Sequence, residues 1–207
     1  MLTLFKKQST SKLFKAIEAG DLTSLAKRLR KTDAAELNNQ TDQQHSAIEA
    51  AIIANQPQVL ELLIRAGASI KQRSSTDEPY LLLALKQAQS LPLINALLKS
   101  GATTEYKPQD TDTHLIAACF KHCATTEIML HLSRFLEYGV NLNQLDAQEM
   151  SALDYALETQ NKELLNFLIA SGIQTPDEWP SSLPTDIKQH VTRAVDDLRI
   201  RQMFLDQ

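Results

Sequence analysis

The 207-residue sequence is short of cysteine and of aromatic residues, and both shortages narrow the classes of protein it can belong to. Its two cysteines are Cys119 and Cys123, so a disulfide framework cannot hold the fold, and a reducing, cytoplasmic location is expected. Aromatic residues make up 5% of the chain, whereas α/β enzymes usually fill their cores with Phe, Tyr and Trp. Its core residues are instead largely Ala, Leu and Ile, a mixture that favours helices packed closely side by side.

Long apolar runs and an excess of positive charge are missing as well. No segment approaches the roughly 18 consecutive apolar residues of a membrane span, and the first residues lack the apolar core of a secretory signal. The formal net charge is -4 and the sequence pI is about 5.7, so the global field repels nucleic acid and anionic membranes. We therefore expect neither nucleic acid nor a membrane as a partner.

Glycine is scarce too, and the positions of the five glycines indicate a repeat. Four of them follow apolar runs of helical character, and successive members of this set are 34, 38 and 33 residues apart: Gly67, Gly101, Gly139 and Gly172. Glycine suits the residue just past a helix end, because that residue adopts a positive φ. The sequence therefore predicts helices that end in glycine at a regular period.

A shorter helix is expected at the start of each unit, in the segments 46–51, 80–85, 113–118 and 151–156. In three units its central apolar residue, such as Leu153, lies 19 residues before the glycine. Leu115 lies 24 residues before Gly139, so this unit carries about five extra residues, which we place within 119–131.

These patterns are similar to the ankyrin repeat, whose period is about 33 residues. The segment 113–118, Thr-His-Leu-Ile-Ala-Ala, stands where that family has Thr-Pro-Leu-His-x-Ala, and the segment 146–151 stands where it has Asp-x-x-Gly-x-Thr. The match is degenerate. The turn glycine of the family is replaced by Gln44 and Glu149, and its mid-repeat glycine by Asn55, Gln89 and Gln160.

The resemblance implies an all-α solenoid of about five ankyrin-like repeats closed by a C-terminal capping helix. We place an N-terminal segment at 1–10 and the array at 11–175, followed by a loop and the capping helix at 176–207. The repeats are expected at about 11–40, 41–74, 75–107, 108–145 and 146–175. The charged run 27–31 suits the outer face of a terminal repeat.

Cys119 and Cys123 are the strongest candidates for chemistry. They lie four residues apart with His122 between them, and His114 and His131 are near in the sequence. Residues i and i+4 share a helix face, so two thiolates there could meet a soft metal ion. A buried thiol also packs like alanine, however, and no second cysteine pair completes a tetrahedral site. We expect no metal, and a metal- or redox-responsive protein remains the alternative.

Other catalytic signals are missing from the sequence. It contains no Gly-rich phosphate loop, no His-Glu-x-x-His and no Gly-x-Ser-x-Gly. We expect no catalytic residues and no cofactor, so the chain is not expected to be an enzyme.

In ankyrin repeats the turn tips and the exposed side of the first helices form a concave binding groove, and the resemblance implies the same here. Ile53, Phe120 and Met150 are apolar residues at such places, where interface anchors are usual, although packing between repeats could also bury them. The acidic tips suggest a protein partner with a basic face. The expected function is that of an adapter or a specific inhibitor of an enzyme or toxin. The implied binding residues are Asp42, Gln43, His45, Ile53, Asp77, Gln87, Asp110, Asp112, Phe120, Lys121, Gln148 and Met150.

Overall fold

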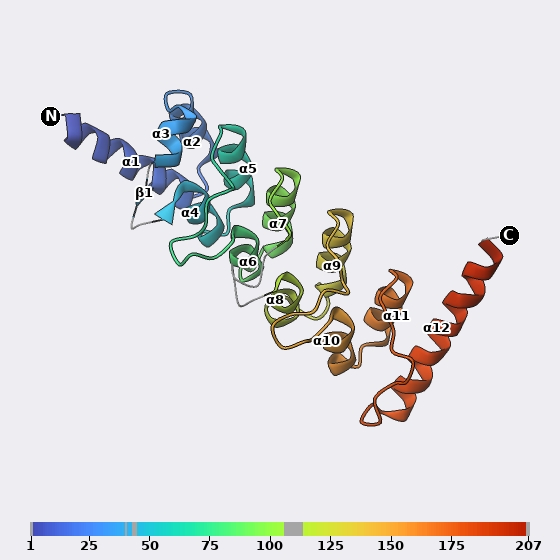
Figure 1. Ribbon diagram of the computed structural model, residues 1–207. Helices are drawn as coiled ribbons and strands as arrows, with labels where there is room; N and C mark the ends of the chain where they lie inside the picture. Colours follow the sequence, from blue (N-terminus) through green and yellow to red (C-terminus); the bar gives the residue numbers. More distant parts are fainter. Residues whose placement is uncertain (1, 40, 43–44, 106–113, 206–207) are drawn as a thin grey trace. The chain divides into compact units, whose positions relative to one another are not determined.

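The computed structural model describes residues 2–39, 41–42, 45–105 and 114–205, except for the side chains of 2–9 and 41–42. The chain divides into two compact units, Met1–Tyr106 and Lys107–Gln207, called here the first and the second unit. Both units are built from paired helices (Figure 1), which confirms the predicted all-α repeat architecture.

Three helix pairs make up most of the first unit. The first helices of successive pairs, α1, α4 and α6, pack against one another, and the second helices, α2, α5 and α7, do the same. The pairs are α1 (Leu2–Glu18) with α2 (Leu22–Leu29), α4 (Ala47–Ile53) with α5 (Pro57–Arg65), and α6 (Tyr80–Leu85) with α7 (Ser90–Lys99). Helix α1 begins at Leu2, so it includes most of the N-terminal segment that the sequence analysis set apart.

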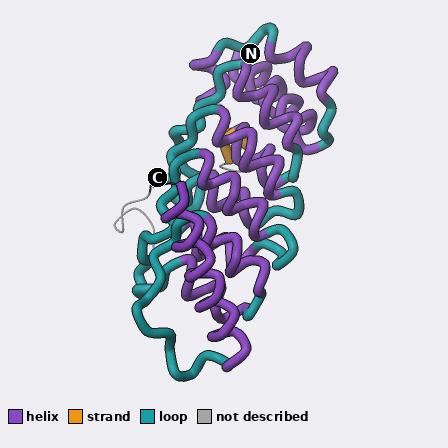
Figure 2. The backbone as a smooth tube through the Cα atoms, turned by 90° about the vertical axis from the view of Figure 1, so that its right-hand side faces the viewer, coloured by secondary structure: helices purple, strands orange, loops and turns teal. Residues whose placement is uncertain are grey.

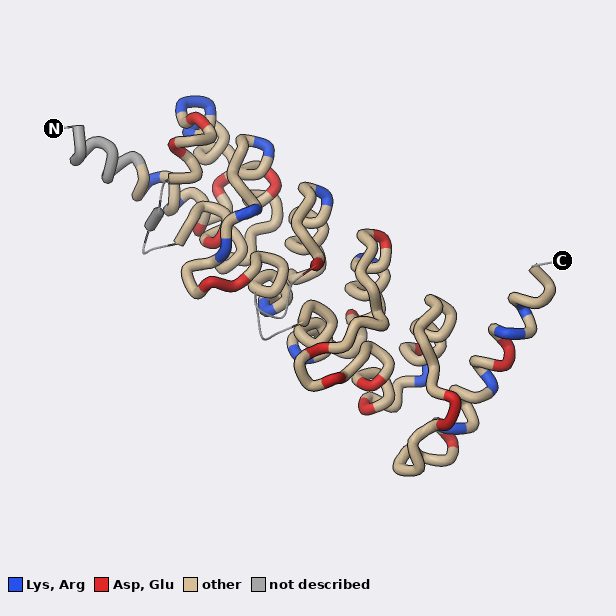
Figure 3. The backbone as a smooth tube through the Cα atoms, viewed as in Figure 1, with Lys and Arg blue, Asp and Glu red and all other residues tan. Residues whose placement is uncertain are grey.

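The first unit also contains short elements that the sequence analysis did not anticipate. Helix α3 (Ala34–Asn39) follows α2, and strands β1 (Thr41–Asp42) and β2 (His45–Ser46) form an antiparallel pair before α4. Basic residues gather toward the C-terminal end of α2 (Figure 3), as expected of the charged run in a terminal repeat.

The second unit contains two helix pairs and a long final helix. Within it, as in the first unit, loops connect helices that pack against one another (Figure 2). The pairs are α8 (Leu115–His122) with α9 (Ile128–Glu137) and α10 (Ala152–Thr159) with α11 (Lys162–Ala170), followed by α12 (Thr185–Leu205). The connection 123–127 between α8 and α9 is longer than the connection 160–161 between α10 and α11. Part of the extra residues of this repeat therefore lies in the turn between its two helices.

The glycines end helices as the sequence predicted. The φ angles of Gly67, Gly101, Gly139 and Gly172 are 93°, 84°, 79° and 82°. Beyond Gly67, the N–H of Ala68 donates to the carbonyl of Leu63 over 3.0 Å, the bond that closes a helix around a left-handed residue. Equivalent bonds of 3.0, 3.1 and 3.2 Å are donated by Ala102, Val140 and Ile173.

Helix α12 covers α11 through its N-terminal half. Ile187 and Val191 are buried, whereas Met203 and Phe204 near the other end are 61% and 74% exposed. Within the described part of the chain, no helix combines the length and the apolar character needed to cross a membrane.

Candidate functional site

A cavity of about 580 Å³ opens on the second unit between α8 and α10. Its lining comes from these two helices and from the turn that precedes α10: Ala117, Phe120, Lys121, Gln148, Tyr155, Glu158 and Thr159. Three of the binding residues implied by the sequence, namely Phe120, Lys121 and Gln148, therefore lie together around one cavity.

Two stacked aromatic rings dominate the cavity wall. Phe120 of α8 stacks on Tyr155 of α10, with ring centroids 5.3 Å apart and an interplanar angle of 22°. Both side chains are half-buried, so part of each ring is exposed to solvent. Stacked rings offer a large and rigid apolar surface, which suits contact with an apolar or cationic side chain of a partner.

The turn 146–150 is fixed against the Tyr155 ring by the carboxylate of Asp146. Its Oδ1 accepts the N–H groups of Gln148 (2.9 Å) and Met150 (3.0 Å), and its Oδ2 accepts the hydroxyl of Tyr155. Burial alone would raise the pKa of Asp146, but these hydrogen bonds outweigh it and lower the pKa below the ordinary value. Burial and the bond to Asp146 raise the pKa of Tyr155 to about 12, so the phenol remains a donor at neutral pH.

Charge at the cavity is mixed. Lys121 on α8 and Glu158 on α10 are both exposed, so each can pair with a partner group of opposite charge. The hydroxyl of Thr159 donates its proton to the backbone carbonyl of Ala156 over 2.7 Å. This lining suits binding better than nucleophilic chemistry.

The described site residues of the first unit lie on different elements. Ile53, at the end of α4, is 46% exposed, as an anchor requires. Gln87 is half-buried and donates to the carbonyl of Leu83 over 3.1 Å. The carboxylate of Asp77 is paired with Arg73 at 2.7 Å, so the acidic character of this turn is partly neutralised.

Four predicted residues have no described side chain. Gln43, Asp110 and Asp112 lie outside the described residues, and Asp42 is described only as part of β1. Met150 is described and half-buried, but it does not line the cavity.

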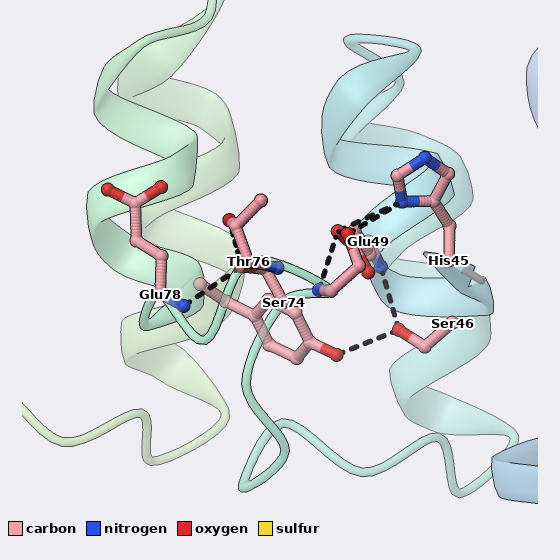
Figure 4. A network of polar contacts seen from close by, with 8 residues as sticks. His45, Ser46, Glu49, Ser74, Thr76 and Glu78 are labelled. Carbon is pink, nitrogen blue, oxygen red and sulfur yellow. Dashed lines mark hydrogen bonds and ion pairs between the residues drawn. The ribbon is translucent and has the colours of Figure 1, made fainter.

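A buried polar network in the first unit was missed by the sequence analysis. Glu49 of α4 is 3% exposed, and its carboxylate accepts from the N–H (2.9 Å) and hydroxyl (2.7 Å) of Ser75. His45 lies 3.0 Å from the same oxygen, and Ser46 shares a 2.7 Å hydrogen bond with Tyr80 (Figure 4). The sequence contained one sign of this network, because Glu49 stands among the small and apolar residues of a first helix. His45 therefore serves the packing of two repeats and is not simply an exposed tip.

Among the residues that the structure describes, one group of side chains could hold a metal ion. Ligand atoms of Cys119, Cys123 and His131 all lie within 4.8 Å of one another. The sequence left open which histidine accompanies the two cysteines, and the fold brings His131 to them.

Residues 81–177 match the family model for ankyrin repeats in three copies. The chain therefore contains ankyrin repeats over these residues. A segment of 75 residues is 35% identical to the mouse (Mus musculus) protein named Ankyrin repeat and SOCS box protein 6. That segment is 36% of this chain and 18% of the mouse protein, so this likeness concerns a small part of the relative.

Several ankyrin glycine positions keep their backbone conformation after losing the glycine. Glu149, at the turn position, has a φ of 60°, and Asn55 and Gln160, at the mid-repeat position, have φ values of 56° and 53°. Asp77 occupies the turn position of the third ankyrin repeat and also has a φ of 60°. Gln89, at the mid-repeat position of the same repeat, has a φ of -105° and does not follow this pattern.

Proposed function

We propose that the chain is a non-catalytic interaction module that holds a folded protein through its first helices and turn tips. Ankyrin repeats are generally protein–protein interaction modules. The observation that carries the proposal is the open cavity at the Phe120–Tyr155 stack, which is lined by residues of two first helices and one turn.

The cavity suits one protruding side chain of the partner. An apolar or arginine side chain would lie against the two rings, and Lys121 and Glu158 would orient the groups around it. Exposed Glu149 and Asp77 support a partner with a basic face. The bond between Arg73 and Asp77 weakens this preference in the first unit, so we assign the larger share of affinity to the cavity.

Within this class, the chain acts as an adapter or as a specific inhibitor of an enzyme or toxin. We further propose a cytoplasmic location, because the thiols of Cys119 and Cys123 are not joined by a disulfide.

The proposal is tested by affinity capture from the native host with wild-type and Phe120→Ala chains. A matched control is Leu130→Ala, because Leu130 is a large apolar residue of the same unit that is 55% exposed on α9 and lies outside the cavity. For the captured partner, Phe120→Ala should cost about 2 kcal/mol or more of binding free energy, and Leu130→Ala should cost little.

Charge variants test the contribution of the acidic turn tips separately from that of the cavity. Asp77→Asn and Asp110→Asn should mainly slow association, and Arg65→Glu on α5, where the side chain is 79% exposed, should have little effect. Lys162 is a poor control, because it lies 3.0 Å from Asp186 of α12. Equal losses from Phe120→Ala and Leu130→Ala, with circular dichroism confirming that both are folded, would place the interface elsewhere.

A further inference from the structure

Three soft or borderline ligands converge in the interior of the second unit. Cys119 lies in α8, Cys123 is the residue that ends it, and His131 lies in α9. Cys119 and His131 are fully buried, and Cys123 is partly exposed. Sulfur and ring nitrogen atoms of all three are within 4.8 Å of one another.

The extra residues of this repeat create the cluster. Cys123 ends α8 with an extended backbone (φ -87°, ψ 147°), while its N–H still donates to the carbonyl of Cys119 over 2.9 Å. The two cysteines therefore remain one helical turn apart, on the same side. The lengthened connection 123–127 then leads into α9, which packs on α8 and brings His131 to the thiols.

A hydrogen bond to the backbone fixes the ring of His131. Its Nδ1 lies 2.9 Å from the backbone oxygen of Glu127, and a carbonyl oxygen can only accept a hydrogen bond. In the neutral ring Nδ1 therefore carries the proton, and the lone pair lies on Nε2. Histidines that bind metals usually make this type of hydrogen bond through the other ring nitrogen, because it fixes the tautomer and the direction of the ring.

We propose that Cys119, Cys123 and His131 form a binding site for one zinc ion, which joins α8 to α9. Ligands of a tetrahedral zinc ion lie about 3.5–3.8 Å apart, given bonds of about 2.3 Å to sulfur and about 2.0 Å to nitrogen. A contraction of about 1 Å would therefore bring the three ligand atoms into place.

Charge balance favours a divalent ion at this site. When Zn²⁺ binds, two Zn–S bonds form, each thiol releases its proton to solvent, and neutral His131 adds a Zn–N bond. Two thiolates and Zn²⁺ sum to zero charge, which a buried site accommodates at lower cost than the net negative charge that Cu⁺ would leave. Water is the fourth ligand, entering from the side of Cys123, which is the partly exposed member of the cluster.

The alternative interpretation is that the two thiols and the imidazole fill space in the core and bind no metal ion. It explains Cys119, whose burial resembles that of alanine. Hydrogen bonds of the Cys123 thiol to Cys119 and to the His131 ring also hold the three groups together without a metal ion. Titration with Zn²⁺ separates the two interpretations. The sequence has no second cysteine pair to complete a metal site, but the fold supplies a third ligand from another helix.

The test uses the full chain, reduced and freed of metal, and then titrated with Zn²⁺ and with Co²⁺. We expect one equivalent of zinc to remain after gel filtration, and Co²⁺ to give visible bands of a tetrahedral site with thiolate ligands. Zinc at about 100 times its Kd should raise Tm by roughly 5–10 °C.

Cys123→Ser and His131→Gln should each lose the cobalt bands and at least about tenfold in zinc affinity, since each removes one ligand. His122→Ala is the matched control, because His122 is an exposed neighbour outside the cluster, and it should retain both signals. Circular dichroism of each variant separates lost ligation from lost folding. Absence of zinc and cobalt binding in the reduced wild type, including a result in which the cysteines only form a disulfide, overturns the proposal. Equal binding by Cys123→Ser also overturns it.

Discussion

The carboxylate of Glu49 accepts two hydrogen bonds from Ser75, a residue 26 positions later in the next repeat. One bond comes from the backbone N–H at 2.9 Å and the other from the hydroxyl at 2.7 Å. With only 3% of its surface exposed, Glu49 is a buried charge whose partners come from both repeats. This contact ties α4 to the turn that precedes α6.

Glu49→Gln should lower the free energy of unfolding at pH 7 by about 1–3 kcal/mol, because a charged acceptor is replaced by a neutral one. Burial raises the pKa of Glu49, but the bonds from Ser75 and His45 outweigh burial and lower the pKa below 4.5. A lowered folded-state pKa stabilises the protein above about pH 4.5, and this contribution is lost as the pH falls through the folded value. Urea unfolding at pH 7 and pH 3 measures it.

The variant should therefore lose less stability than the wild type between these two pH values. Glu61→Gln is the control, because Glu61 of α5 is half exposed, and it should change stability by less than about 0.5 kcal/mol. An identical pH response of wild type and Glu49→Gln would show that Glu49 does not contribute to acid sensitivity.

Two helix-ending glycines should differ in their tolerance of alanine. Both Gly67 and Gly101 have a positive φ, so alanine should cost about 1–2 kcal/mol at either position. A β-carbon at Gly101 meets no atom within 4 Å, whereas one at Gly67 would lie 2.8 Å from the β-carbon of Ala34. Gly67→Ala should therefore be the more destabilising by at least about 1 kcal/mol in thermal or chemical unfolding. Equal losses of stability in the two variants would mean that α3 shifts away from the new β-carbon at position 67 without a cost in free energy.

Helix ends and helix pairing were predictable because their signals are local. A glycine at a fixed distance after an apolar run requires no knowledge of the rest of the fold, and the ends at Gly67 and Gly172 follow the prediction. The sequence left open whether Ile53 is exposed or buried between repeats, and in the structure it is 46% exposed.

Features that depend on contacts between helices were not predictable in the same way. A glutamate is usually a surface residue, but in the structure Glu49 is buried. Its carboxylate is hydrogen-bonded to Ser75 of the next repeat, a contact that the sequence alone does not reveal. His131 was one of several candidate histidines, and its choice depends on the direction of the chain through the connection 123–127. The sequence indicated Phe120 as a possible anchor but did not indicate Tyr155, which stacks on it from the next repeat.

Gln160→Gly should stabilise the protein by about 1 kcal/mol. Gln160 ends α10 in the left-handed region, with φ 53° and ψ 20°, where side chains other than glycine are strained. Gln89 occupies the equivalent mid-repeat position with φ -105°, so Gln89→Gly should give no gain and serves as the matched control. Differential scanning calorimetry of the two variants decides between relief of strain and a general effect of glycine. A gain at both positions would contradict the strain argument.

The two halves of α12 should contribute unequally to stability. Ile187→Ala should cost about 2–4 kcal/mol, because Ile187 is 3% exposed in the half of the helix that covers α11. Met203→Ala should cost less than about 0.5 kcal/mol, because that side chain is 61% exposed.

Deletion of residues 185–207 would expose the apolar surface of α11 and should cause aggregation, whereas deletion of 201–207 should not. A monomeric 1–184 chain with an unchanged Tm would rule out the covering role.

Tyr155→Phe should separate the two roles of Tyr155, since it removes the hydroxyl donor but keeps the ring against Phe120. Without that donor, the pKa of Asp146 should rise toward 3.8, and the turn 146–150 should lose about 1–2 kcal/mol of stability at pH 7. The lowered pKa of Asp146 means that this stability is present above about pH 3.8 and lost as the pH falls through the folded value, so the variant should be less sensitive to acid. A carboxyl-detected NMR titration of Asp146, with unfolding at pH 7 and pH 3, measures both effects.

Binding of the partner to the Tyr155→Phe variant should decrease less than binding to Phe120→Ala, because the ring surface of Tyr155 remains. If Tyr155→Phe abolishes binding as completely as Phe120→Ala while the pKa of Asp146 stays unchanged, the hydroxyl contacts the partner directly and does not act through the turn.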